Sequence, residues 1–368
     1  MRVAIVHYWL VGMRGGEKVV EALCEMFPEA DVFTHVYDPK NISETIRRHE
    51  VRTTFIQKLP RAKRWYRRYL PLMPVALEQL DLSGYDLIIS SESGPAKGLL
   101  VPSGALHVCY CHTPMRYVWD MYHQYLRDSG FIMRLLMVPG IHYVRQWDAV
   151  SAGRVDHFIA NSVNVAKRIR RHYRRDSEVI HPPVDTTNFA PASERGDFYL
   201  IVGQLVRYKR VDVAIDAFNK LGRRLVIIGD GEESGALSRR AEDNISLMGW
   251  QPPEVLADHY ARCRALIFPG EEDFGIVPIE AMASGRPVIA YRKGGALETV
   301  VEGITGIFFD EQTPESLSDA VARYETETAD FEPDVIVRHA RSFDRAVFKR
   351  RMRETLDRLL EERLLDAD

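Results

Sequence analysis

The fold of this chain is decided by residues 265–291, which have the sequence ALIFPGEEDFGIVPIEAMASGRPVIAY. Its apolar ends, Leu266–Phe268 and Val288–Ala290, are predicted to be buried strands, and the segment between them is predicted to contain a helix. The acidic residues before that helix then lie at a strand-to-helix turn, where α/β proteins place their ligands. The pattern predicts a β-α-β unit with a binding site at the strand ends.

The residues of this turn suit an anion beside a polyol. Pro278 fits the first turn of a helix because it lacks the N–H group that would go unpaired there. The N–H groups around Gly275, Ile276 and Val277 can then face an anion, which the helix dipole also favours. Glu280, inside the helix, is within reach of vicinal hydroxyls. We interpret the turn as a site for a nucleotide sugar.

Apolar runs alternate with helical patterns along the whole chain, which indicates parallel sheets covered by helices on both faces. The predicted strands are Val3–Tyr8, Val32–Val36, Leu87–Ser91, Val108–Cys111, Phe158–Ala160, Val179–Ile180, Tyr199–Val202, Leu225–Ile228, Ile245–Met248, Leu266–Phe268, Val288–Ala290 and Gly306–Phe309. A single sheet of twelve strands would be unusually large. We therefore predict an α/β protein with two Rossmann-like domains whose parallel sheets face each other across a cleft.

A proline pair at 182–183 and a polar stretch over 186–196 mark the predicted break between the domains. We expect an N-terminal, acceptor-side domain over residues 1–185 and a C-terminal, nucleotide-sugar domain over residues 197–345. The charged, amphipathic tail 346–368 is expected to be a helix.

Composition limits the function. The net charge of -3 argues against a general nucleic-acid partner. The four cysteines follow neither a zinc nor a disulfide pattern, and Cys109 and Cys111 are predicted to be buried strand residues. No apolar run reaches the about 20 residues that span a bilayer. These features favour a cytoplasmic protein, and the lack of a metal-ligand pattern predicts turnover without a metal or cofactor.

Cations follow the predicted strand Tyr199–Val202. Arg207 and Lys209 suit the charge that develops on a nucleoside diphosphate leaving group. Asp230 lies in a Gly-Asp-Gly turn after Leu225–Ile228, which is similar to a dinucleotide loop. Ser234 replaces the third glycine of that loop, so an ordinary strand-to-helix turn is an equal alternative.

The first domain has two candidate regions. Gly15 and Gly16 lie between the first strand and a helix predicted to begin at Glu17, where their N–H groups can contact a diphosphate, although a flexible loop is an even alternative. His112 stands at the end of a strand beside a proline, which favours a ligand site over a purely structural role. The nearby residues expected to hold the donor sugar or the acceptor are Arg116, Tyr117 and Asp120.

Residues 52–77 contain seven cations and no acid, interleaved with aromatic residues. This pattern favours an anionic membrane surface, whereas single-stranded nucleic acid and a solvated helix face are the alternatives. The residues predicted to contact the membrane are Lys58, Arg61, Lys63, Arg64, Trp65, Arg67 and Arg68. The apolar segment 131–147 can extend the same surface.

Glu272 and Glu280, with Phe274-Gly275 between them, resemble the spaced glutamate pair of family-four retaining glycosyltransferases of GT-B fold. Within this family the chain is most similar to bacterial mannosyltransferases of exopolysaccharide and O-antigen (lipopolysaccharide) assembly. Lys209 matches the family's diphosphate lysine. Many relatives have an arginine where this chain has Gln204, and whether Arg207 replaces it is open.

The resemblance implies the remaining roles. Glu272 orients the sugar hydroxyls, Glu280 holds the ribose diol, and His112 contacts the donor sugar. The donor site then includes Phe274, Gly275 and the residues after them. The C-terminal helix of such enzymes often crosses back to the first domain.

The implied function is a retaining, metal-independent hexosyltransferase with GDP-mannose as donor. Its acceptor is a glycan or lipid-linked oligosaccharide, and its place is peripheral, at the inner face of the plasma membrane. Mannose and guanine rest on the subgroup alone, so other nucleotide sugars remain open, as do the acceptor, the linkage and the oligomeric state. A GT-B nucleotide-sugar epimerase and a non-catalytic member of a polysaccharide assembly complex are the alternative functions.

Overall fold

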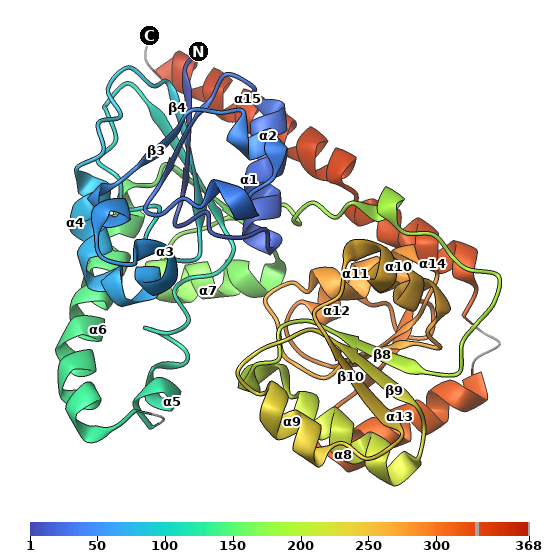
Figure 1. Cartoon of the computed structure of the whole chain (residues 1–368). Coiled ribbons are helices and arrows are strands. Elements are labelled where there is room, and N and C mark those ends of the chain that lie inside the picture. Colours follow the sequence, from blue (N-terminus) through green and yellow to red (C-terminus); the bar gives the residue numbers. More distant parts are fainter. Residues whose placement is uncertain (128, 328–330, 367–368) are drawn as a thin grey trace. The chain divides into compact units, whose positions relative to one another are not determined.

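The computed structural model describes residues 1–127, 129–327 and 331–366, and the chain divides into two compact units (Figure 1). Unit 1 comprises Met1–Pro182 and Phe348–Asp368, and unit 2 comprises Pro183–Val347. The chain thus leaves unit 1 between two adjacent prolines and returns to it near its C-terminus. Residues 367 and 368 of the predicted tail lie outside the described residues.

Unit 1 is built on a seven-stranded sheet with the order β3-β2-β1-β4-β5-β6-β7, and every neighbouring pair is parallel. The strands are β1 (Val3–His7), β2 (Asp31–Thr34), β3 (Val51–Thr53), β4 (Leu87–Glu92), β5 (Leu106–Cys111), β6 (His157–Ala160) and β7 (Glu178–Val179). The helices are α1 (Gly15–Met26), α2 (Glu44–Arg47), α3 (Ala62–Trp65), α4 (Met73–Glu78), α5 (Tyr122–Arg127), α6 (Phe131–Ser151) and α7 (Val163–Tyr173). Short 3₁₀ segments are η1 (Pro39–Asn41), η2 (Phe55–Lys58), η3 (Tyr66–Leu72) and η4 (Ala152–Arg154).

Strand β1 shows why helices cover both faces of this sheet. Successive side chains of a strand point to opposite faces. Val3 and Ile5 pack in a cluster with α1 and α2, whereas Ala4 and Val6 pack in a second cluster with Leu77 of α4. Because both sets are buried, the strand is a continuous apolar run, as parallel sheets require.

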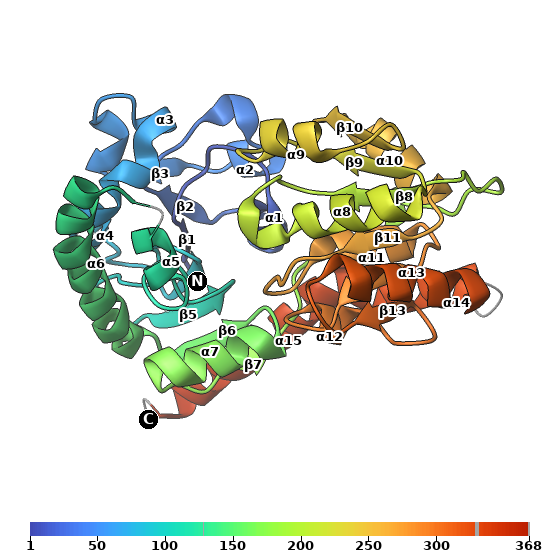
Figure 2. The ribbon, with the colours of Figure 1, turned by 90° about the horizontal axis from the view of Figure 1, so that it is seen from below.

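The last helix, α15 (Arg345–Asp366), starts in unit 2 and ends in unit 1. Phe348, Met352, Leu356 and Leu359 recur at helical spacing, and their side chains join the core cluster of α1. The C-terminal segment is therefore a structural part of the first unit, which can be followed in Figure 2.

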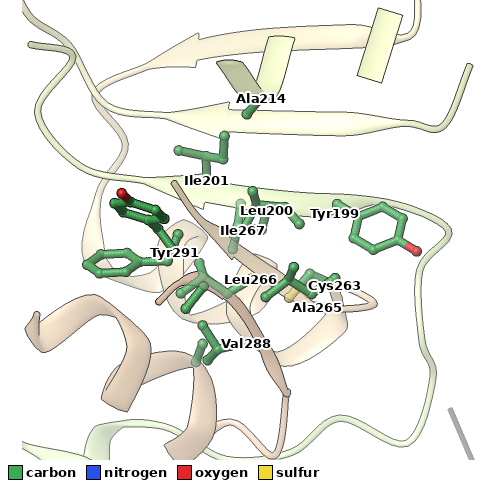
Figure 3. Close-up of a cluster of buried hydrophobic side chains, with 14 of the residues drawn as sticks. Tyr199, Leu200, Ile201, Ala214, Cys263, Ala265, Leu266, Ile267, Val288 and Tyr291 are labelled. Carbon is green, nitrogen blue, oxygen red and sulfur yellow. The ribbon is translucent and has the colours of Figure 1, made fainter. Parts of the chain in front are cut away.

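Unit 2 repeats the design with a six-stranded parallel sheet of order β10-β9-β8-β11-β12-β13. The strands are β8 (Tyr199–Val202), β9 (Leu225–Ile228), β10 (Ile245–Gly249), β11 (Leu266–Phe268), β12 (Val288–Tyr291) and β13 (Gly306–Phe309). The helices are α8 (Val211–Leu221), α9 (Ser234–Arg240), α10 (Pro253–Arg262), α11 (Ile276–Ala283), α12 (Ala296–Thr299), α13 (Pro314–Glu327) and α14 (Pro333–Ala340). Strand side chains such as Leu200, Ile267 and Val288 fill its core (Figure 3).

The predicted α/β class with two Rossmann-like parallel sheets is confirmed, and Cys109 and Cys111 are buried in β5 as expected. One strand was missed. Val51–Thr53 forms β3 at the sheet edge, where Arg52 and Thr53 are exposed, so no apolar run marks it. The basic segment after it is a chain of short helices, η2, α3, η3 and α4, and not one helix. No helix in the described part of the chain is both long enough and apolar enough to cross a membrane.

Each sheet contains a point where the strand order reverses. In unit 2 the chain builds outward from β8 in one direction and from β11 in the other, and in unit 1 it does so from β1 and β4. Open parallel sheets bind ligands outside the carboxyl ends of the strands at such switch points. We therefore expect the ligand site of unit 2 at the carboxyl ends of β8 and β11, and that of unit 1 at the carboxyl ends of β1 and β4.

Candidate functional site

In unit 2, Lys209 and Glu272 meet at the switch point. Lys209 ends the 3₁₀ segment η6 (Arg207–Lys209), which follows β8, and Glu272 lies in the turn after β11. The Lys209 Nζ atom lies 2.9 Å from the Glu272 Oε1 atom. Burial alone would lower the pKa of Lys209, but the carboxylate outweighs it and holds that pKa above its usual value. The lysine is therefore charged at neutral pH.

The backbone beside this pair leaves no room for larger residues. Gly203, directly after β8, has a φ of +145°, and a Cβ atom there would lie 2.7 Å from Lys209 Nζ. Glycine is the residue that adopts such a backbone readily. Gly203, Lys209 and Glu272 line a recess together with Gln204, Pro269 and Gly270. Lys209 and Glu272 therefore both border an open recess at the strand ends.

Helix α11 begins shortly after Glu272 in the chain. Gly275 precedes its first residue with a φ of +90°, and the apolar Phe274 is buried beneath the turn. The first N–H groups of a helix, here those of Ile276 and Val277, have no partner within it. The start of α11 therefore presents backbone donors, as the sequence pattern predicts for an anion site.

Glu280 lies one turn further along α11, and a buried tyrosine holds its carboxylate. The Tyr260 hydroxyl donates a hydrogen bond to Glu280 Oε2 at 2.7 Å. Tyr260 comes from α10 and is 0% exposed, whereas Glu280 is half-buried. One oxygen of Glu280 is thus oriented by the protein core.

Sequence reasoning missed Tyr260 because the two residues come from separate helices. It also missed Gly294 and Gly295, which lie after β12. The Gly295 N–H donates to the Glu272 carbonyl at 2.9 Å, and a Cβ on Gly294 would lie 2.3 Å from that oxygen. In the sequence, only the Gly-Gly pair itself pointed to this contact. In the structure, the pair supports the acidic turn through the Glu272 carbonyl.

The other predicted donor residues of unit 2 lie at its surface. Arg207 and Gln204 are both exposed. Asp230 is exposed as well, and its carboxylate accepts hydrogen bonds from the Gly231 N–H and the Ser234 hydroxyl, each at 2.7 Å. The Ser234 bond and then the Gly231 bond hold the pKa of Asp230 below its usual value. Asp230 therefore closes its own turn.

In unit 1, His112 follows β5 and contacts the end of β4. Its Nε2 atom lies 2.8 Å from the hydroxyl of Ser91, and its backbone N–H donates to the Glu92 carbonyl at 2.7 Å. Burial, with His7 nearby, lowers the pKa of His112 to about 3. The imidazole is therefore neutral at physiological pH, and it can exchange hydrogen bonds with hydroxyl groups.

Helix α1 starts beside this histidine, and it starts earlier than predicted. Gly15 and Gly16, expected in a loop before Glu17, are its first two residues. A Cβ atom on Gly16 would lie 2.6 Å from the Tyr8 hydroxyl and 3.6 Å from His112 Nε2. The absence of a side chain brings the start of the helix, with its N–H groups, against the end of the sheet.

The residues after His112 are used differently. Asp120 is exposed, and its carboxylate is 3.2 Å from His172 Nε2 and 3.5 Å from Arg168 Nε, both on α7. Arg116 and Tyr117 are half-buried, and the Tyr117 hydroxyl oxygen has no hydrogen-bond partner among the described residues. Asp120 therefore anchors this loop to α7.

In the basic segment, three arginines stack on aromatic rings. The guanidinium carbons of Arg61 and Arg68 lie 4.8 Å and 4.9 Å from the Trp65 ring centre, and that of Arg67 lies 5.6 Å from the Tyr66 ring. Lys63 contacts Asp38 at 2.9 Å. All seven cations of the segment are exposed, namely Arg52, Lys58, Arg61, Lys63, Arg64, Arg67 and Arg68. In the described part of the chain, no three His, Cys, Asp or Glu side chains cluster as metal ligands would.

Both halves of the chain match known protein families. Residues 13–188 match the model described as Glycosyltransferase Family 4, and residues 185–341 match the model described as Glycosyl transferases group 1. Among solved structures, sucrose-phosphate synthase from Thermosynechococcus elongatus superposes with a TM-score of 0.72 and 17% identity, over 98% of this chain and 100% of that one. HepE of Anabaena, in complex with UDP and glucose, gives 0.70 and 16%, over 97% and 99%. The fold is that of the GT-B glycosyltransferases.

The curated relatives align with this chain over only part of their length. The D-inositol 3-phosphate glycosyltransferase of Nocardiopsis dassonvillei is 31% identical over 210 residues, which cover 48% of this chain and 49% of the relative. The α-1,3/1,6-mannosyltransferase alg-2 of Neurospora crassa is 27% identical over 294 residues, with coverages of 64% and 60%. The chain therefore spans about half the length of the first of these relatives.

Proposed function

We propose that this chain, which belongs to the group 1 glycosyltransferases of GT-B fold, is a retaining hexosyltransferase that uses a nucleoside-diphosphate sugar. GDP-mannose is the proposed donor. The proposed acceptor is a lipid-linked oligosaccharide or another glycan of a bacterial surface polysaccharide, either exopolysaccharide or lipopolysaccharide.

The pairing of Lys209 with Glu272 at the end of β8 and β11 carries this proposal. A charged ammonium and a carboxylate border one recess at the switch point of unit 2, and α11 begins shortly after that carboxylate in the chain. An ammonium and helix N–H groups bind a diphosphate, and carboxylates accept hydrogen bonds from sugar hydroxyls. A diphosphate joined to a sugar has both requirements in one ligand.

In the proposed reaction, the bond between the anomeric carbon and the diphosphate oxygen breaks, and its electron pair stays on that oxygen. An acceptor hydroxyl then bonds to the anomeric carbon on the same face, and its proton passes to the departing phosphate oxygen. Lys209 and Arg207 stabilise the charge of the leaving group. A preorganised donor of this kind contributes roughly a hundredfold to a thousandfold in rate.

The other candidate residues bind and orient in this proposal. Glu272 accepts hydrogen bonds from sugar hydroxyls, and Glu280, held by Tyr260, accepts them from the ribose diol. His112 contacts the donor sugar, and the N–H groups of Gly15 and Gly16 contact the diphosphate. No residue is needed as a separate base, because the leaving phosphate accepts the proton.

The similar proteins differ in the donor that they suggest. The Neurospora crassa relative is named as a mannosyltransferase, which favours mannose, whereas the Anabaena neighbour was solved with UDP and glucose. Differences of one group in a pocket are worth only about 1–3 kcal/mol, so the donor has to be measured.

Peripheral membrane binding at the inner face of the plasma membrane is proposed from one side of unit 1. Segment η3, with its exposed cations, packs against α6 (Figure 1). Trp147 of α6 also donates a hydrogen bond to Glu78 of α4. On α6, the exposed side chains Phe131, Leu135 and Val138 form one apolar stripe at helical spacing. Exposed cations and exposed apolar side chains on elements that pack together suit an anionic lipid surface.

A thermal-shift series tests the function. GDP-mannose should raise the melting temperature of the wild-type protein more than UDP-glucose does, because a ligand bound only to the folded state stabilises it. The shift should shrink in the Glu280→Ala variant, each variant being compared with its own ligand-free form. Donor hydrolysis or transfer should persist in EDTA. If no nucleotide sugar shifts the wild-type melting temperature and none is hydrolysed, the proposal is wrong.

A further inference from the structure

A single buried hydroxyl joins two histidines at the switch point of unit 1. His7 ends β1, Ser91 lies opposite it near the end of β4, and His112 follows β5, the next strand. The Ser91 Oγ atom lies 3.0 Å from His7 Nδ1 and 2.8 Å from His112 Nε2. Ser91 and His7 are 0% and 1% exposed. Both contacts therefore lie away from bulk water.

The hydroxyl couples the two imidazoles. A serine hydroxyl has one proton and two acceptor lone pairs, so when it donates to one ring it has to accept from the other if both contacts are hydrogen bonds. A neutral imidazole has one N–H donor and one acceptor nitrogen. When His7 Nδ1 is an acceptor, the Ser91 hydroxyl donates to it, and His112 Nε2 then has to be the donor to Ser91.

The buried carboxylate of Glu17 determines which nitrogen of His7 carries the proton. His7 Nε2 lies 3.9 Å from Glu17 Oε1, and among the described residues this nitrogen has no hydrogen-bond partner. Glu17 is 3% exposed, and its second oxygen accepts the Arg14 N–H at 3.1 Å. The contact is too long for a hydrogen bond, but the negative charge of the carboxylate favours the proton on the nearer nitrogen, Nε2 of His7.

We propose that Glu17 acts through His7 and Ser91 to hold His112 as its Nε2–H tautomer. With Nε2–H on His7, its Nδ1 accepts the Ser91 hydroxyl proton, and the Ser91 oxygen accepts the proton of His112 Nε2. The Nδ1 atom of His112 is then the acceptor nitrogen of that ring. Glu17, His7 and Ser91 are positioning residues, because they act through His112.

This relay gives His112 a defined preference. As an acceptor, His112 Nδ1 recognises a ligand hydroxyl that donates a hydrogen bond, and it disfavours an analogue in which fluorine or hydrogen replaces that hydroxyl. This consequence rests on the proposed function, whereas the relay itself does not. The low pKa of His112, lowered to about 3 by burial, agrees with a ring that stays neutral.

The relay is tested by ¹⁵N NMR of histidine-labelled protein at pH 8, without any ligand. His7→Gln and His112→Gln variants assign the two rings among the twelve histidines. The wild-type protein should show Nε2–H on both rings. Glu17→Gln, which removes the charge, should lower the ratio of Nε2–H to Nδ1–H by about fivefold on both rings. Glu21→Gln is the matched control on the same helix, because Glu21 is 7% exposed and contacts Lys18 at 3.2 Å; it should leave both rings unchanged.

Ser91→Ala separates transmission from local packing. In that background, Glu17→Gln should still change His7 and should no longer change His112. The proposal is overturned if the wild-type His112 carries its proton on Nδ1. It is also overturned if Glu17→Gln leaves the His112 nitrogens unchanged, a result that can be obtained even if Ser91→Ala does not fold. Donor binding by thermal shift is scored separately, so that a failure of the relay and a failure of the glycosyltransferase proposal are distinguishable.

Discussion

The ammonium nitrogen of Lys209 and the carboxylate oxygen of Glu272 lie 2.9 Å apart, across the two strands from which the sheet of unit 2 grows in opposite directions. Each side chain is about one-fifth exposed, so the pair is only partly desolvated. In the proposed enzyme a diphosphate competes with Glu272 for the ammonium, which frees the carboxylate for the sugar hydroxyls. The pair thus holds both groups in place before the donor binds.

Replacing Lys209 by methionine tests this role. Lys209→Met keeps the length of the side chain and removes its charge, so the departing diphosphate loses a donor. We expect kcat to fall by about a hundredfold to a thousandfold, with a smaller change in KM. Initial rates of transfer or donor hydrolysis measure both. Lys220→Met is the control, because Lys220 also contacts a glutamate, Glu315, at 2.6 Å, but on the exposed surface. Equal rates for the two variants would remove Lys209 from the reaction.

Tyr260→Phe tests whether Glu280 has to be oriented. The change removes only the hydroxyl that donates to Glu280 Oε2 at 2.7 Å. A hydrogen bond to a charged group contributes about 1.5–3 kcal/mol, so donor affinity should fall by at least about tenfold in calorimetry. A matched control is Tyr324→Phe, because Tyr324 is also buried in unit 2 and donates to the Arg264 carbonyl at 2.6 Å. That variant should lose stability and keep donor affinity. Similar affinities in both variants would assign Tyr260 to packing alone.

Much of the fold could be predicted, because each parallel strand is buried on both faces and therefore appears as an apolar run. Strand β3 could not, since it lies at the sheet edge and contains the exposed Arg52. The predicted start of α1, at Glu17, was two residues too late. Gly15 and Gly16 are poor helix formers, yet they begin the helix, and a Cβ at Gly16 would lie only 2.6 Å from the Tyr8 hydroxyl.

The candidate site was predicted where it depends on strand ends and not where it depends on contacts between helices. Lys209 and Glu272 both follow strands, so a parallel sheet brings them to the same edge. Tyr260 and Ser91 contact their partners through tertiary packing, for which spacing in the sequence contains no signal. The carboxylates of Asp230 and Asp120 hold their own loops, which the residue types alone do not distinguish from ligand contacts.

Buried histidines should make the stability of unit 1 depend on pH. Burial lowers the pKa of His35 and His107 to about 4 and that of His112 to about 3. Below the ordinary value of 6.5 the unfolded chain binds protons that the folded protein excludes, so stability is lost as pH falls from about 6.5 to about 4. Each histidine removes up to about 1.4 kcal/mol per pH unit. Glu92 works in the opposite direction, because burial raises its pKa to about 7 despite Lys97, but it offsets only one of the three.

Urea unfolding followed by tryptophan fluorescence at pH 7.5, 6 and 5 measures this dependence. The signal reports mainly on unit 1, which contains Trp9, Trp65, Trp119 and Trp147. His107→Gln should reduce the loss of unfolding free energy by about 1 kcal/mol per pH unit below pH 6. His142→Gln changes an exposed histidine of α6 and should keep the wild-type slope. Identical slopes for all three proteins would show that the burial of His107 does not govern its protonation.

Charge reversal in the basic segment tests the proposed membrane surface. Arg64 and Arg68 are exposed in α3 and η3, and each cation near an anionic lipid surface contributes about 1 kcal/mol. The double variant Arg64→Glu and Arg68→Glu removes two such contributions and adds repulsion. Its partitioning onto vesicles that contain phosphatidylserine should fall by at least about thirtyfold in co-sedimentation. Higher salt should also weaken the binding of the wild-type protein to these vesicles.

The matched control reverses two exposed arginines on another helix of the same unit, with Arg170→Glu and Arg171→Glu in α7. If the whole-protein charge governed binding, both double variants would lose equal affinity, and the basic segment would have no special role.

A third variant, Phe131→Ser with Leu135→Ser, removes apolar side chains of α6 and no charge. It should weaken binding at high salt, where the cations are screened, because the contribution of buried apolar surface does not depend on ionic strength. Binding that is lost only in the α3–η3 variant would restrict the contact to the cations and exclude α6 from the membrane surface.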